Sequence, residues 1–150
     1  MDKNSLPNED VFGELQWVFQ RKKNNIKDLQ QIRDSDQLYE YIRPHYKDVW
    51  DLHERCYVIF FSRSLRILGR WIHTEGSSEG TIVSPKDIIA RALTLKSSSF
   101  AVIHNHPSGG LEPSKEDLKM KDNLLAAAEL MNMAVIDLQI INENGYKSFI

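Results

Sequence analysis

The chain has 150 residues, of which 41% are hydrophobic and 27% charged, and its net charge at pH 7 is −2. This composition predicts one soluble globular domain and argues against a dedicated duplex-DNA binder, which is usually strongly basic. No apolar run could span a bilayer, the polar N-terminus lacks a secretory signal, and Cys56 is the single cysteine. We therefore expect a cytoplasmic protein with no membrane partner.

The N-terminal third predicts a tail, a strand and a short helix. Residues 1–11 are polar and predict a flexible tail, followed by a single domain over residues 12–150. Residues 14–21 alternate apolar and polar side chains, which predicts a strand. Residues 35–43 begin with a capping serine and end before a proline, so they predict a short helix.

The middle of the chain predicts a β-hairpin and a second helix. Residues 55–61 are rich in aromatic and β-branched side chains, and residues 66–73 are the expected antiparallel partner. Residues 74–80 contain Gly, Ser and Glu and predict a mobile loop. A Ser-Pro start predicts a helix over residues 84–96. Its predicted buried side comprises Ile88, Ile89, Ala92 and Leu93.

The last third predicts a strand, a helix and two further strands. Residues 99–103 form a buried apolar run, residues 134–141 form another, and residues 147–150 predict a final short strand. A helix is expected over residues 114–131. Its predicted apolar stripe comprises Met120, Leu124, Ala127 and Met131. The order β-α-β-β-α-β-α-β-β indicates an α/β fold, a mixed β-sheet with flanking helices.

Two histidines follow the buried run of residues 99–103. His104 and His106 are separated by one residue, so on extended backbone both imidazoles point the same way. Ser114 and Asp117 follow across a turn rich in Pro and Gly, at the start of the predicted helix. Two histidines and one carboxylate with an open fourth position are a known way to hold a catalytic Zn²⁺. The spacing therefore predicts a metal site formed by His104, His106 and Asp117.

Helix capping explains part of the same pattern. Ser114 suits an N-cap, and Asp117 at the third helical position can complete a capping box. Capping does not explain two histidines at strand spacing, nor the Gly-Gly pair beside them. Two other zinc classes fit less well, because a deaminase needs a Cys-x-x-Cys pair and a thermolysin-like protease needs His-Glu-x-x-His on a helix.

These residues resemble a known family. His-x-His, seven residues, then Ser-x-x-Asp is the JAMM signature of JAB/MPN metalloproteins, and the string His104-Asn-His-Pro-Ser-Gly109 is similar to the RadC branch. The resemblance extends over residues 35–150 and implies the JAB/MPN metalloprotease-like fold, which is related to that of cytidine deaminases. This chain looks like a short form without the helix-hairpin-helix segment of longer RadC proteins. It has Leu138 where the family usually has a histidine.

The resemblance also implies an activity, hydrolysis of a peptide or isopeptide bond by a zinc-activated water. In the family a glutamate at the start of an upstream strand is the general base, and Glu54 matches its position. The motif serine, here Ser114, would donate a hydrogen bond to the water or the oxyanion. Without the resemblance, nothing local distinguishes Glu54 from Glu75 or Glu79. The implied substrate is a peptide or a protein conjugate.

Two other functions stay open. One is a DNA-repair or mobile-DNA-associated module whose metal is structural or vestigial. The charge does not support a nucleic-acid partner, because the densest basic cluster, Arg21-Lys-Lys23, is typical of solvated surface. The other is a catalytically silent binding domain built on the JAB scaffold, since a fold does not determine a function. The sequence does not predict an oligomeric state.

Overall fold

A computed structural model describes residues 25–76 and 83–150. Within these residues, five strands form one mixed sheet in the order β2-β1-β3-β4-β5. The strands are β1 (Arg55–Phe61), β2 (Ile67–Glu75), β3 (Ser99–Asn105), β4 (Ala134–Asn142) and β5 (Gly145–Ser148). β3 and β4 run parallel, and the other neighbouring strands run antiparallel. The predicted α/β class with a mixed sheet is confirmed.

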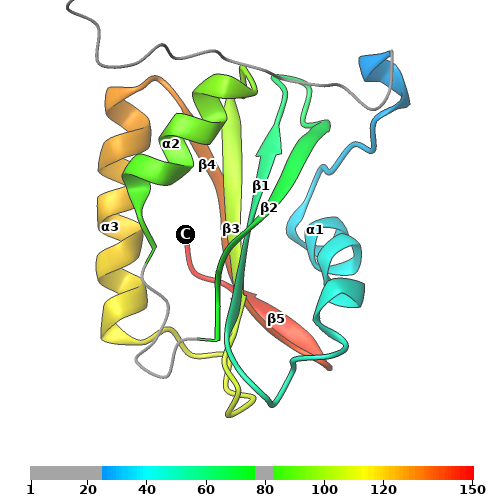
Figure 1. Ribbon diagram of the computed structural model, residues 1–150, viewed down its shortest axis with the longest axis vertical. Helices are drawn as coiled ribbons and strands as arrows, with labels where there is room; N and C mark the ends of the chain where they lie inside the picture. The colour runs from blue at the N-terminus through cyan, green and yellow to red at the C-terminus, as the bar shows by residue number, and fades with distance from the viewer. Residues whose placement is uncertain (1–24, 77–82) are drawn as a thin grey trace, which may run out of the picture.

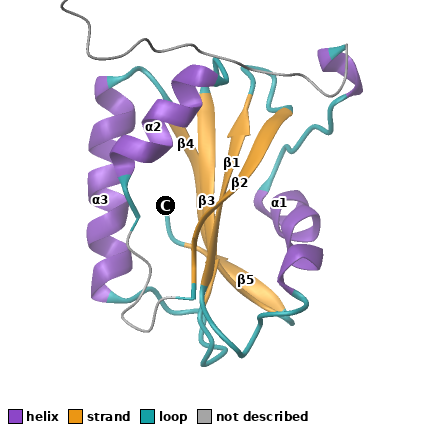
Figure 2. Ribbon diagram, viewed as in Figure 1, coloured by secondary structure: helices purple, strands orange, loops and turns teal. Residues whose placement is uncertain are grey.

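Helices cover both faces of this sheet (Figures 1 and 2). α1 (Ser35–Ile42) lies on one face, and α2 (Pro85–Thr94) and α3 (Lys115–Leu130) lie on the other. Two short 3-10 helices, Ile26–Asp28 and Arg43–Tyr46, complete the described elements. Among the helices of residues 25–76 and 83–150, none is both long enough and apolar enough to cross a membrane.

The sheet separates two hydrophobic clusters, and β3 contributes to both. Phe100 and Val102 pack with α2 and α3, whereas Ala101 and Ile103 pack on the α1 side. All seven residues of β3 are buried, which explains why the sequence shows an unbroken apolar run rather than an alternation. His104 continues the period of Phe100 and Val102, so its side chain belongs to the face covered by α2 and α3.

Some boundaries differ from the sequence-based predictions. β2 extends to Glu75, beyond the predicted end at residue 73, because Glu75 pairs with Arg55 across the hairpin. Leu93 is 48% exposed instead of buried, since it lies at the margin of the face centred on Ile88 and Ala92. The last strand covers residues 145–148, so the predicted range of residues 147–150 was shifted by two residues.

The end of α3 also departs from its predicted stripe. Leu124 is buried as expected, but Met131 is the C-cap residue and is 39% exposed. Ala128, one turn beyond Leu124, is the buried residue instead. The predicted tail of residues 1–11 and the predicted strand of residues 14–21 lie outside the described residues.

Candidate metal centre

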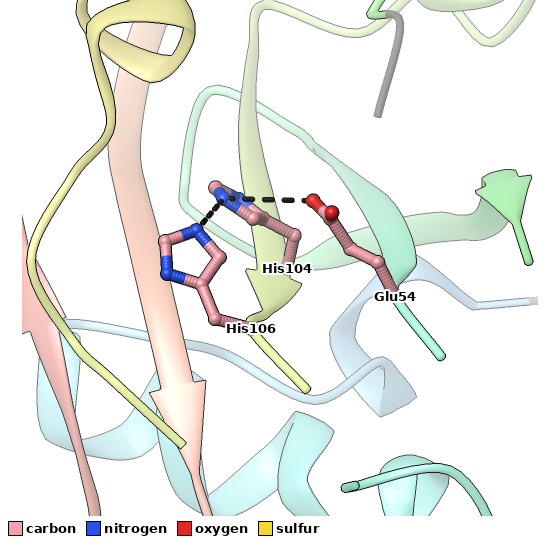
Figure 3. Close-up of side chains that lie close together, drawn as sticks. All are labelled: Glu54, His104 and His106. Atoms are coloured by element: carbon pink, nitrogen blue, oxygen red, sulfur yellow. Dashed lines mark hydrogen bonds and ion pairs between the residues drawn. The ribbon is translucent and has the colours of Figure 1, made fainter. Parts of the chain in front are cut away.

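Two neighbouring strands bring three side chains together at one end of β3 (Figure 3). His104 is the penultimate residue of β3 and is 2% exposed, and His106 follows directly after the strand. Glu54 immediately precedes β1. Because Cys56 pairs with His104 in the antiparallel β1–β3 register, the start of β1 lies beside the end of β3. Strand pairing therefore places Glu54 beside the histidines, although fifty positions separate it from His104 in the sequence.

The ligand atoms of these three residues are close enough to share a metal ion. The Nε2 atoms of His104 and His106 are 3.2 Å apart. Glu54 Oε1 lies 3.9 Å from His104 Nε2. One ligand atom from each of the three residues lies within 4.8 Å of the others, and together they form a candidate metal site.

Asp117, from the first turn of α3, reaches the same point. Its Oδ1 lies 3.0 Å from His104 Nε2, and its Oδ2 lies 3.2 Å from His106 Nε2. Tetrahedral zinc with bonds of about 2.0–2.1 Å separates its ligand atoms by about 3.3 Å. The structure thus brings the three predicted ligands to nearly this spacing. Two imidazole nitrogens and a carboxylate oxygen fit zinc in spacing and in chemistry.

The capping box predicted as the structural alternative is also present. Ser114 Oγ accepts a hydrogen bond of 3.1 Å from the Asp117 backbone N–H, and Asp117 Oδ2 accepts one of 2.8 Å from the Ser114 backbone N–H. The two roles of Asp117 are compatible, because its Oδ1 still contacts His104. Ser114 uses its oxygen as an acceptor in the cap, so its hydroxyl hydrogen is free of that bond and can donate elsewhere.

The Asp117 carboxylate and the His106 imidazole stabilise each other's charged forms. Burial acts to raise the pKa of Asp117, but hydrogen bonds from His104 and His106 outweigh it and hold that pKa well below its usual range. The hydrogen bond to Asp117 raises the pKa of His106 against the opposing effect of burial. Asp117 is therefore ionised at neutral pH, as a metal ligand must be.

This pairing predicts a pH dependence of stability for the metal-free protein. Because His106 has a raised folded-state pKa, its contribution is complete below the unfolded value of 6.5 and is lost as pH rises through the folded value. Asp117 stays ionised over this range, because its folded-state pKa lies well below the unfolded pKa of 3.8. Its contribution to stability is lost only as pH falls below that unfolded pKa. We expect the free energy of unfolding to decrease above pH 6.5, as measured by urea denaturation at stepped pH. The decrease should be absent in His106→Gln; an equal decrease in that variant would contradict the assignment.

An ion-pair cluster beside Glu54 was missed by sequence reasoning. The Arg55 guanidinium bonds both carboxylate oxygens of Asp48, at 3.0 and 3.2 Å, and its Nε donates to Glu75 at 3.0 Å. Glu75 Oε1 also lies 3.0 Å from His53 Nε2. Hydrogen bonds from Arg55 and, to a smaller extent, from His53 lower the pKa of Glu75. No local signal could reveal this cluster, because its members meet only when β1 and β2 pair.

Comparison with known proteins places this geometry in a family. Residues 32–150 match the family described as RadC-like JAB domain. A UPF0758 protein of Thermotoga maritima is 35% identical over 92 residues, which cover 61% of this chain and 41% of the relative. The UPF0758 protein tlr1707 of Thermosynechococcus vestitus is 34% identical over 100 residues, 67% of this chain and 40% of the relative. The chain thus spans about two fifths of the length of the curated relatives it matches. The chain belongs to the RadC-like JAB domain family.

Proposed function

We propose that this domain is a zinc-dependent hydrolase of the JAMM type that cleaves a peptide or isopeptide amide bond. The observation that supports it most is the convergence of His104, His106 and Asp117: the two Nε2 atoms are 3.2 Å apart, and each lies 3.0–3.2 Å from one oxygen of the Asp117 carboxylate. Glu54 provides a further carboxylate beside them, with 13% of its side chain exposed. The expected substrate is a peptide or a protein conjugate.

The distances favour Asp117 as the third ligand and Glu54 as the general base. Asp117 contacts both histidines at close to the ligand separation of about 3.3 Å expected around tetrahedral zinc. Glu54 Oε1 is farther from His104 Nε2, at 3.9 Å, which exceeds the separation of about 3.3 Å expected between two ligands of tetrahedral zinc. We therefore assign Glu54 to proton transfer.

Each residue then has a defined task in amide hydrolysis. Zinc, when bound, lowers the pKa of a coordinated water to about 7. Glu54 accepts a proton from the attacking water and later delivers it to the leaving amine. Ser114, whose oxygen serves the helix cap, donates its hydroxyl hydrogen to the oxygen of the scissile carbonyl as negative charge develops there.

Metal removal and restoration test this proposal. Elemental mass spectrometry of the purified chain should find about one zinc per chain. A chelator should remove both the zinc and the hydrolysis of a mixed panel of peptide and lysine-linked isopeptide substrates, and added zinc should restore both. Hydrolysis that survives complete zinc removal would contradict the mechanism. Stoichiometric zinc without hydrolysis across the panel would point to a structural metal.

A further inference from the structure

A buried amide stands between the two histidines in the sequence. Asn105 is the last residue of β3 and is completely buried, and by the alternation of the strand its side chain points to the face opposite that of His104. On that face it meets the segment that leads into β1. Its Oδ1 accepts a hydrogen bond of 2.8 Å from the Arg55 backbone N–H, and its Nδ2 donates one of 3.0 Å to the His53 carbonyl.

These two bonds lie on either side of Glu54. The His53 carbonyl belongs to the peptide group before Glu54, and the Arg55 N–H belongs to the peptide group after it. A third bond, 2.9 Å from the Gly76 N–H to the Glu54 carbonyl, ties the same residue to the end of β2. The peptide group before Glu54 is thus held at its carbonyl, and the peptide group after Glu54 is held at both its N–H and its carbonyl.

The chemistry of position 105 requires an amide. A carboxylate of the same shape offers acceptors but no donor, and an apolar side chain of the same size offers neither. Asn105 and its bond with the Arg55 N–H are fully buried, so that N–H would lack water to replace a lost partner. An asparagine satisfies both flanking groups at once, and its Nδ2 also reaches the Trp50 carbonyl at 3.1 Å.

We infer that Asn105 is a positioning residue that sets the distance between Glu54 and the two histidines. Its backbone is covalently joined to both His104 and His106, and its side chain holds the backbone on both sides of Glu54. Base and ligands are therefore connected through one residue. The inference rests on the proposed function in so far as Glu54 is the base. Displacement of a reacting group by about 1 Å can cost roughly 100-fold in rate, so such a connection matters for catalysis.

A second buried amide provides a matched control. Gln139 on β4 is also completely buried, and its Nε2 donates to the Ser35 carbonyl at 2.9 Å and to Asp137 Oδ2 at 2.8 Å. Like Asn105, it joins a sheet strand to a segment on the α1 side. Its partners are remote from Glu54 in the chain. Gln139→Ala therefore reproduces the loss of a buried amide without touching the Glu54 segment.

The test that does not depend on activity is carboxyl NMR of the zinc-loaded protein labelled with ¹³C at glutamate side-chain carboxyls. The Glu54 signal is the one missing in Glu54→Gln. Asn105→Ala should shift or broaden it while zinc content stays at the wild-type level, and Gln139→Ala should leave it in place. If Asn105→Ala does not fold, Asn105→Asp keeps the acceptor for Arg55 and should also move the signal. A Glu54 signal unchanged in the folded Asn105 variant, or moved equally by Gln139→Ala, would overturn the inference.

The activity arm separates this inference from the proposed function. Asn105→Ala should lower kcat roughly 10- to 100-fold with little change in KM. In the Glu54→Gln background it should cause no further loss, because a residue that acts through Glu54 has nothing left to position. An additive loss would overturn the positioning role. If the wild-type protein hydrolyses nothing, the proposed function fails, while the NMR result still decides whether Asn105 holds Glu54.

Discussion

Replacing Glu54 with Gln is expected to remove most of the hydrolytic activity while zinc stays bound. The variant keeps the size of the side chain but loses its ability to accept a proton. General acid–base catalysis contributes about 10²- to 10⁴-fold, and we expect kcat to fall within that range. Steady-state kinetics and elemental analysis of the same protein preparation would measure both quantities.

The control for this variant is Glu116→Gln, which neutralises an exposed acid in the first turn of α3. It changes the net charge equally and should retain wild-type kinetics. Loss of zinc from Glu54→Gln would refute the base assignment. In that case Glu54 would be a ligand, in line with the short distances that group it with His104 and His106.

Replacing Asp117 with Ala is expected to abolish zinc binding at micromolar metal. Loss of residues that merely orient a ligand typically costs 10- to 100-fold in metal affinity, so loss of a ligand should exceed about 100-fold. The same change removes half of the capping box of α3 and the pairing with His106, so we expect at least about 1 kcal/mol of destabilisation. A competition titration against a chromophoric chelator would measure the affinity, and urea denaturation of the metal-free proteins would measure the stability.

Two further variants separate the two roles of Asp117. Ser114→Ala removes the other side-chain acceptor of the capping box but leaves the carboxylate in place, so it should be destabilised and still bind zinc. Asp117→Asn keeps an oxygen that can accept the cap bond but loses the charge, so it should recover the stability due to the cap, but not that due to the pairing with His106, and bind zinc weakly. Wild-type zinc affinity in Asp117→Asn would contradict the ligand assignment.

The elements that the sequence predicted well are those whose residues pack on both faces. The runs at residues 55–61 and 99–103 were recognised because every residue in β1 and β3 is buried, which leaves a dense apolar pattern. The start of α3 was recognised from Ser114 and Asp117, whose side chains satisfy the first backbone N–H groups of the helix locally. Helix caps and completely buried strands can both be recognised from the sequence pattern.

Features that depend on strand pairing could not be recognised from a local sequence pattern. Without the family resemblance, Glu54 could not be distinguished from Glu75, because its place beside His104 results from the register of β1 against β3. The extension of β2 to Glu75 has the same origin in the pairing with Arg55. Leu93 was misplaced because helical period alone does not tell how wide the contact between α2 and the sheet is.

The position of β3 at the centre of the sheet gives the two histidines unequal freedom. His104 lies within a strand that is hydrogen-bonded on both sides, to β1 and to β4, so exposing its ring requires disruption of the sheet. His106 lies one residue beyond the strand, and 20% of its side chain is exposed. Local opening of its loop needs far less energy than global unfolding. Release of a bound ion would therefore begin with transient detachment of His106, while the sheet keeps His104 in its place.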